Sequence, residues 1–151
     1  MRNCLVILPL LAIAVASCGG SSATPNFAGA ANAICARADG QIEALVPSTN
    51  TPKAEARLLR KAFAIAQVEY DRLSRLTAPG KQESLFVSGL QEQTHLLALG
   101  REESAALNHG EVSAAYKLLD RSNRYAAAND LAMSALGLKA CAANPQPRGK
   151  H

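Results

Sequence analysis

The four cysteines are the residues of this chain with the clearest chemistry. Cys4 and Cys18 belong to the N-terminal segment, whereas Cys35 and Cys141 stand near opposite ends of the remaining sequence. Two thiols can form a disulfide, bind a metal ion or stay reduced and buried. The sequence has no C-x-x-C pair, no C-x-x-C-H motif and no histidine close to Cys35 or Cys141, which disfavours zinc or haem. A Cys35–Cys141 disulfide is therefore the favoured outcome, and two free buried thiols or a metal site are the alternatives.

Glu92 and His95 form an E-x-x-H motif, which supplies ligands in di-iron helical bundles. Such a site needs the motif twice and a further glutamate from each of two other helices. The core-facing position of this stretch is Gln93, which turns Glu92 and His95 toward solvent. A G-x-S-x-G elbow and a phosphate-binding glycine motif are also missing from the sequence. We expect no catalytic residue, no metal site, no cofactor and no enzymatic activity.

The N-terminal segment has the pattern of an export signal. Arg2 is followed by an uninterrupted apolar run from Leu5 to Ala16. The length of this run is typical of a signal sequence and too short for a transmembrane helix. Ala14-Val15-Ala16 fits a small-x-small cleavage site before Ser17. Cleavage there would release a secreted protein.

The same segment ends in Val15-Ala16-Ser17-Cys18, which resembles the lipobox of bacterial lipoproteins. This resemblance implies that residues 1–17 are removed and that Cys18 carries a lipid. The protein would then be anchored to the cell membrane on its extracytoplasmic side, where disulfides can form. Residues 18–25 are rich in Gly and Ser and would act as a flexible tether. We prefer lipidation to secretion because a free thiol is unfavourable in a secreted protein.

The composition indicates a helical domain. The sequence has no Trp, three Phe and three Tyr, whereas alanine, the best helix former, is abundant. Strand-favouring residues are scarce. The formal net charge is +4, and removal of Arg2 with the signal leaves +3. This mildly basic balance, together with export, excludes a nucleic acid as the partner.

Four amphipathic helices are expected. They cover residues 27 to about 46, 52 to the stop at 78–80, about 82 to 108, and 112 to about 136. Their core-facing residues are spaced alternately by three and four, which is typical of antiparallel helices that cross at small angles. Short connections then favour an all-α, up-down-up-down four-helix bundle over residues 26–141. In the fourth helix the core-facing series begins with Val112, Ala115 and Leu119.

Four core-facing positions are polar, namely Gln93, Ser104, Ser122 and Asn129. Buried polar groups must be satisfied, so these side chains either pair across the bundle or line a small wet pocket. Pairing is the favoured interpretation. Gly100 lies on the same face of its helix and is expected to let two helices pack closely.

The end of the fourth helix explains how the two remaining cysteines could meet. Gly137 fits a helix C-cap, and Leu138 fits the hydrophobic contact that accompanies such a cap. The chain would then return to the first helix, which is expected to lie beside the fourth. A Cys35–Cys141 bridge closes a loop of about 106 residues, worth up to about 4.7 kcal/mol in the chain-entropy model.

Six basic residues on the second helix are candidates for binding an anionic surface, such as lipid headgroups or wall polymers. They are Lys53, Arg57, Arg60, Lys61, Arg72 and Arg75. The alternative is a solvated face that is partly neutralised by Glu69 with Arg72 and by Asp71 with Arg75, at helical spacing. Three acids, Glu55, Glu69 and Asp71, are interleaved with these basic residues and favour this alternative.

The lipobox, the tether and an Ala- and Arg-rich domain with one cysteine in its first helix and one after its last resemble small bacterial lipoproteins of actinobacterial type. The resemblance implies a location and a fold but no activity. We expect an interaction or structural module of the cell envelope, with an envelope protein or a wall polymer as partner. The alternative is a sensor or carrier that holds a small ligand between its helices. Residues 142–151 are expected to form a disordered basic tail.

Overall fold

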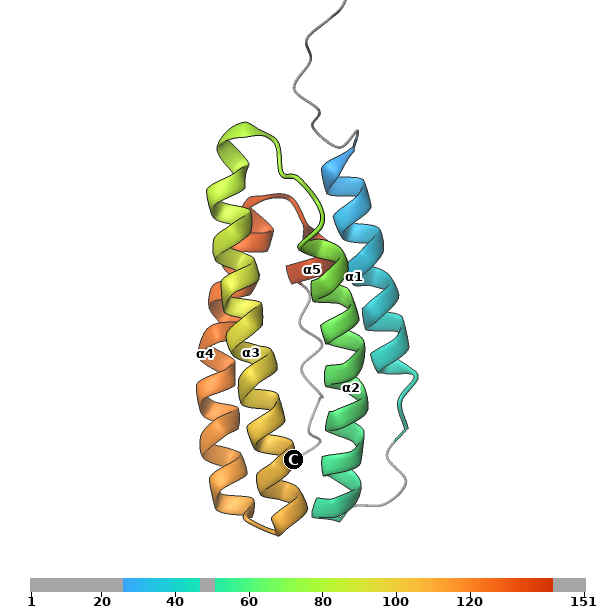
Figure 1. Cartoon of the computed structure of the whole chain (residues 1–151), viewed down its shortest axis with the longest axis vertical. Coiled ribbons are helices and arrows are strands. Elements are labelled where there is room, and N and C mark those ends of the chain that lie inside the picture. The colour runs from blue at the N-terminus through green and yellow to red at the C-terminus, as the bar shows by residue number, and fades with distance from the viewer. Residues whose placement is uncertain (1–25, 47–50, 143–151) are drawn as a thin grey trace, which may run out of the picture.

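The computed structural model describes residues 26–46 and 51–142, which fold into a bundle of four long helices (Figure 1). The elements are α1 (Phe27–Glu43), α2 (Pro52–Leu73), the 3-10 helix η1 (Gly80–Gln82), α3 (Glu83–His109), α4 (Val112–Ala135) and α5 (Lys139–Ala142). These two segments contain no strand, and the predicted helical bundle is confirmed. The predicted signal, the lipidation of Cys18, the tether and all but the first residue of the predicted tail lie outside the described residues.

Polar side chains mark the starts of α1 and α2. Asn26 and Thr51 each accept a hydrogen bond from a backbone N–H three residues further on, at 3.1 and 3.3 Å, as N-cap residues do. α1 ends at Glu43 rather than near residue 46. Ala44 is the C-cap, and the N–H of Leu45 bonds to the carbonyl oxygen of Ile42 at 3.0 Å, so the chain tightens into a turn there.

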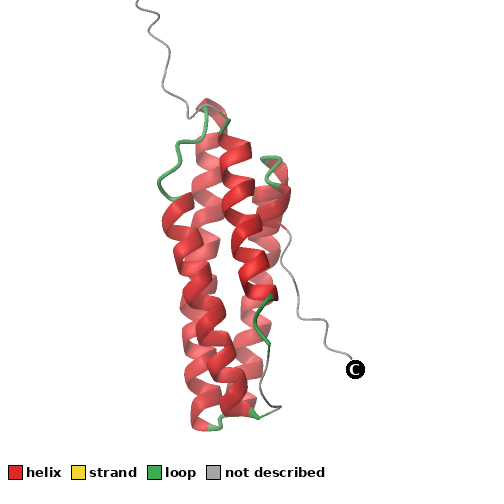
Figure 2. Ribbon diagram, turned by 90° about the vertical axis from the view of Figure 1, so that its right-hand side faces the viewer, coloured by secondary structure: helices red, strands yellow, loops and turns green. Residues whose placement is uncertain are grey.

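Each long helix packs against its neighbour in sequence, so that α2 lies between α1 and α3, and α3 lies between α2 and α4 (Figures 1 and 2). α3 has 27 residues and α1 has 17, which correspond to about 40 and 26 Å. α1 therefore lies beside only the upper part of α2 in the view of Figure 1. At the lower end, the bundle consists of α2, α3 and α4.

Two apolar clusters reflect this difference between the ends. The upper cluster contains large side chains, including the fully buried Leu73, Met133 and Leu138. The rings of Phe27 and Phe86 meet edge to face within it, with centroids 4.9 Å apart. The buried members of the lower cluster are Ala56, Ala106, Leu107 and Ala115. The upper end therefore has the larger apolar core.

Two predicted core positions of α4 are wrong. Val112 and Leu119 are 36% and 38% exposed, and Leu118 packs against the lower cluster instead. α4 packs on α3 and α5, and α1 is too short to cover the lower part of the bundle. A further helix packed along the whole length of α4 would have buried the face that carries Val112 and Leu119. Because no such helix is present among the described residues, this face is exposed.

Two glycines of α3 allow close approach of the neighbouring helices. A Cβ atom at Gly100 would overlap the ring of Phe63 on α2, which confirms the predicted role of Gly100. A Cβ atom at Gly89 would lie 2.8 Å from Cε of Met133 on α4. Gly89 therefore serves the α3–α4 contact, a role that its sequence position did not indicate.

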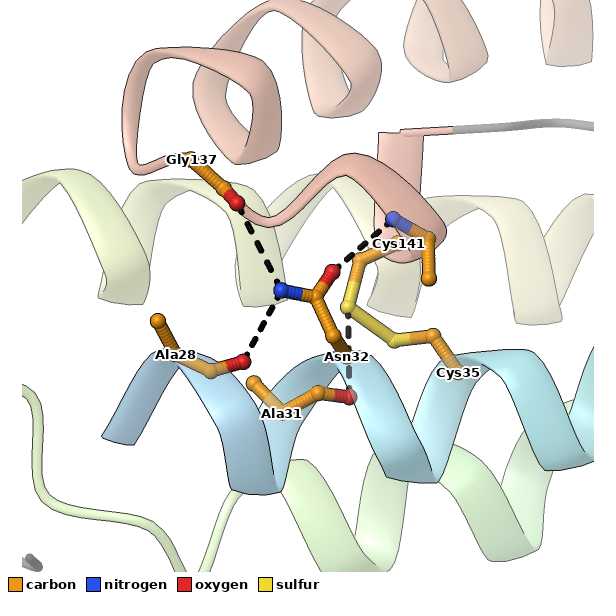
Figure 3. Close-up of a disulfide and its surroundings, with 7 residues drawn as sticks. Ala28, Ala31, Asn32, Cys35, Gly137 and Cys141 are labelled. Atoms are coloured by element: carbon orange, nitrogen blue, oxygen red, sulfur yellow. Dashed lines mark hydrogen bonds between the residues drawn. A yellow bond between two sulfur atoms is a disulfide. The ribbon is translucent and has the colours of Figure 1, made fainter. Parts of the chain in front are cut away.

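The chain beyond α4 turns back to α1 and is fixed there covalently (Figure 3). Gly137 caps α4 with a φ of 72°, and Leu138 is fully buried, as predicted. Cys35 of α1 and Cys141 of α5 form the predicted disulfide, with their Cα atoms 5.0 Å apart. α5 contacts both α1 and α4. The first and fourth helices are thus bridged by α5 rather than packed extensively against each other.

Asn32 adds a second link between α1 and the returning chain (Figure 3). Its Nδ2 donates to the carbonyl oxygen of Gly137 at 3.4 Å, and its Oδ1 accepts from the N–H of Ala140 at 2.9 Å. The same amide group therefore binds the chain on both sides of Leu138.

Candidate functional site

The E-x-x-H motif lies on the outside of the bundle. His95 is exposed, and its ring faces that of Tyr125 with centroids 4.8 Å apart. Within residues 26–46 and 51–142, no three His, Cys, Asp or Glu side chains are grouped so that they could hold a metal ion. The notable polar side chains occur in two other places, inside the bundle and on the outer side of α2.

A polar layer crosses the interior of the bundle next to the upper apolar cluster. Gln93 and Asn129 are 8% and 9% exposed, as predicted for core positions. Gly89 of α3 lies opposite Met133 of α4. Gln93 comes four residues after Gly89 and Asn129 four residues before Met133, so on antiparallel helices these two side chains lie at the same level. Glu69 of α2 is hydrogen-bonded to Gln93 and interacts with an aspartate of α1. We call Asp39, Glu69, Gln93 and Asn129 the polar layer.

The carboxyl groups of the polar layer hold their protons unusually tightly. Burial raises the pKa of Glu69 to about 7, with a further contribution from the charge of Asp39 and an opposing one from the hydrogen bond to Gln93. Burial, and then the charge of Glu43, raises the pKa of Asp39 to about 6. Near neutral pH this layer therefore carries less negative charge than two exposed carboxylates would.

The predicted pairing of polar core residues is only partly found. Ser104 donates its hydroxyl hydrogen to the carbonyl oxygen of Ala56 at 3.0 Å, and Gln93 pairs with Glu69. Asn129 Oδ1, Ser122 Oγ and the Oε1 atom of Gln93 itself have no hydrogen-bond partner among the described residues.

Glu103 is a further acid that the fold buries, and residue spacing did not predict its burial. It is 7% exposed, and burial, followed by the charge of Glu55, raises its pKa. Glu103 directly precedes the core-facing Ser104 in the sequence. Its position next to a core-facing residue is the feature of the sequence from which the burial of Glu103 could have been predicted.

All six basic residues of the predicted surface site are exposed. Five of them, from Lys53 to Arg72, fall within a sector of about 120° around α2 at 3.6 residues per turn, and Arg75 follows in the turn after the helix. None of the six forms an ion pair with another described residue. We call Lys53, Arg57, Arg60, Lys61, Arg72 and Arg75 the basic face.

The two acids that were expected to pair with arginines of the basic face, Glu69 and Asp71, are hydrogen-bonded to glutamines instead. Glu69 points into the polar layer and forms no ion pair with Arg72, because its position on α2 faces α1 and α3. Asp71 accepts a hydrogen bond from Nε2 of Gln67 at 2.9 Å and forms no ion pair with Arg75. Neither predicted ion pair is present within the part of the chain that the structure describes, but Asp71 is exposed and keeps a carboxylate beside the basic face.

A groove of about 500 Å³ lies between α2 and α3 in the lower half of the bundle. Phe63 and Gly100 meet at its base, and Arg60 and Arg101 line it from the two helices. We call it the α2–α3 groove. It shares Arg60 with the basic face, so the two features adjoin. Residue spacing does not predict this groove, because the relative rotation of two helices decides which of their side chains meet.

None of the helices in the described segments combines the length and hydropathy needed to cross a lipid bilayer. A comparison with protein-family models finds no match, and comparisons with curated proteins and with solved structures also find none.

Proposed function

We propose that this protein is a lipid-anchored, extracytoplasmic interaction module whose basic face binds the anionic surface of the membrane that carries its anchor. The observation that supports this proposal is the alignment of five exposed basic side chains on one side of α2, with Arg75 in the turn that follows, all without ion-pair partners among the described residues. Of the two acids expected to pair with these side chains, Glu69 is hydrogen-bonded to Gln93 in the polar layer and Asp71 to Gln67.

The expected affinity suits a protein that is already tethered. A Lys or Arg close to an anionic membrane contributes about 1 kcal/mol, so six contribute up to about 6 kcal/mol. This free energy corresponds to a dissociation constant between about 1 mM and 1 μM. Binding of this strength is sufficient when a lipid anchor raises the effective concentration of the protein at the membrane.

The position of the N-terminal end agrees with this arrangement. Phe27 at the start of α1 and Leu73 at the end of α2 belong to the same apolar cluster. The start of α1 therefore lies at the Arg72–Arg75 end of the basic face. An eight-residue Gly/Ser-rich tether would span about 16 Å, enough for α2 to lie along the membrane while Cys18 stays anchored.

A carrier of a small anionic molecule is the second candidate. The α2–α3 groove favours it, because the groove presents two arginines beside an aromatic ring. The basic face extends along the whole of α2 and beyond the groove, however, so binding to an extended surface accounts for more of the exposed charge.

Co-sedimentation with vesicles tests the proposal on the non-acylated protein, produced with the substitution Cys18→Ser. We expect binding to vesicles that contain phosphatidylglycerol, little binding to pure phosphatidylcholine, and a loss of binding as the salt concentration rises. The triple variant Lys53→Gln, Arg57→Gln, Lys61→Gln should bind about 100-fold more weakly, since three charges are removed.

A matched control removes the same charge from another exposed helix surface. Lys117, Arg121 and Arg124 are exposed on α4, and their replacement by Gln should leave most of the vesicle binding intact. Equal losses in the two triple variants would show that net charge alone drives binding, and the basic face would lose its assigned role.

A further inference from the structure

The α2–α3 groove combines two guanidinium groups with no acidic residue among the described residues that line it. Arg60 and Arg101 come from the two facing helices, and neither forms an ion pair with a described residue. Guanidinium groups suit phosphate because their planar fork can donate two parallel hydrogen bonds. Asn108 and His109 add hydrogen-bonding groups to the lining. Charge complementarity therefore favours a phosphate-bearing anion in this groove.

Arg101 is oriented by a neutral group. Its Nη2 donates to Oε1 of Gln67 at 2.7 Å, and Nε2 of Gln67 donates to Asp71 at 2.9 Å. The amide of Gln67 thus stands between the guanidinium and the carboxylate of Asp71. The other N–H groups of Arg101 have no hydrogen-bond partner among the described residues and can bind a ligand.

The base of the groove is apolar. Phe63, Ala64 and Ala105 line it, and Gly100 lets the Phe63 ring lie directly against α3. The glycerol and first acyl carbons of a phospholipid would remove apolar surface from water against this ring, whereas inorganic phosphate would not. The apolar base therefore favours a lipid over free phosphate.

We propose that the α2–α3 groove binds one anionic phospholipid, with its phosphate between Arg60 and Arg101 and its glycerol against Phe63. This proposal rests on the proposed function, because membrane binding by the basic face would bring the adjoining groove to the lipid headgroups. The volume of about 500 Å³ lies within the usual range for small-molecule sites. The basic face then provides general attraction, and the groove provides a site for a single lipid molecule.

A titration followed by NMR tests the groove in the full non-acylated protein. The probe is a short-chain phosphatidylglycerol below its critical micelle concentration, and the readouts are the shifts of the Gly100 amide and the Arg101 side chain. We expect saturable shifts, and binding at least about tenfold weaker for inorganic phosphate. Arg101→Gln should lower the lipid affinity about tenfold, because a hydrogen-bonded charge is lost. Ala105→Leu, which fills the groove from an exposed position, should abolish binding.

Lys53→Gln is the matched control, because it removes one positive charge from the basic face outside the groove. It should leave the titration unchanged and weaken vesicle binding about as much as Arg101→Gln does. If Lys53→Gln and Arg101→Gln alter the titration equally, or if inorganic phosphate binds as tightly as the lipid, the groove site is overturned.

The vesicle assay separates this proposal from the one on which it rests. Salt-sensitive vesicle binding without saturable shifts overturns the groove site and leaves the proposed function standing. Saturable shifts that depend on Arg101, without any vesicle binding, support the groove and overturn membrane binding by the basic face.

Discussion

Two carboxyl groups in the polar layer keep their protons at pH values where exposed carboxyl groups are ionised. The pKa of Glu69 rises from 4.5 to about 7, and that of Asp39 rises from 3.8 to about 6. The folded protein therefore binds these protons more tightly than the unfolded chain does. The resulting stabilisation is complete below the unfolded values and is lost as the pH rises through 6 and 7. The free energy of unfolding should accordingly be higher in mildly acidic than in alkaline solution.

Replacement of Glu69 by Gln should remove most of this pH dependence. Above pH 7 the free energy of unfolding should rise by up to about 3 kcal/mol, because the neutral amide avoids the desolvation of a buried carboxylate. Urea denaturation at several pH values measures the effect. Glu102→Gln, at an exposed position of α3, serves as the control and should change little. A slope between pH 4.5 and 7 that is the same in Glu69→Gln and in the unmodified protein would contradict this role of the polar layer.

Glu69 also shows where residue spacing fails to determine a core position. Two residues could occupy the core-facing position between Ala66 and Leu73 on α2. Glu69 gives spacings of three and four residues, and Tyr70 gives spacings of four and three. Hydropathy favours Tyr70 as the core residue, yet the structure leaves both side chains partly buried. Gln93 had no apolar competitor at its position, and its burial was predicted. The partner of Gln93 could not be predicted, because it depends on the packing of α2 against α3.

At the scale of the helices, the close contact of α2 with α3 depends on the absence of a side chain at Gly100. Gly100→Ala would gain about 1 kcal/mol of helix propensity but would force the new Cβ into the ring of Phe63. Overpacking of this kind costs about 1–3 kcal/mol. We predict a net loss of stability, measured by thermal or urea denaturation, and recovery when Phe63→Leu is added.

Gly40 offers a matched control for this substitution. It lies inside α1, is exposed, and has no atom within 4 Å of an added Cβ. Gly40→Ala should therefore stabilise the protein by up to about 1 kcal/mol. If Gly100→Ala were as stabilising as Gly40→Ala, the close packing of α2 and α3 at this level would be disproved.

The link between α5 and α1 predicts a large effect of reduction. The disulfide closes 106 residues of sequence, and a loop of about 100 residues is worth up to about 4.7 kcal/mol in the chain-entropy model. The double variant Cys35→Ser, Cys141→Ser should lose about 2–4 kcal/mol in urea denaturation. Reduction of the unmodified protein should have the same effect. A loss well below 1 kcal/mol would mean that the bridge adds little constraint beyond the hydrogen bonds of Asn32.

For the whole molecule, the sequence predicts those features that local signals determine. Asn26, Thr51 and Gly137 mark helix ends, and the apolar spacing indicates four antiparallel helices. Together they predict the return of the chain to the first helix and hence the disulfide. The exposure of Val112 and Leu119 follows instead from the packing of α1, which is short and contacts α2 and α5 rather than α4. The direction of Glu69 and the existence of the α2–α3 groove follow from the rotation of packed helices. These features depend on contacts between distant segments, which periodicity alone does not specify.

The unequal ends of the bundle lead to a prediction about its internal stability. The upper end contains the large apolar cluster, α1 and the disulfide, whereas the lower end has three helices around an alanine-rich cluster. Regions with less buried apolar surface open at lower free energy. In native-state hydrogen exchange, amides at 56–60, 104–107 and 115–118 should therefore exchange through partial opening before those at 31–38, 86–90 and 129–136. The Cys35→Ser, Cys141→Ser variant should lower the protection of the second group more than that of the first. Equal opening free energies along the helices would instead show that both ends unfold as one cooperative unit, despite their different cores.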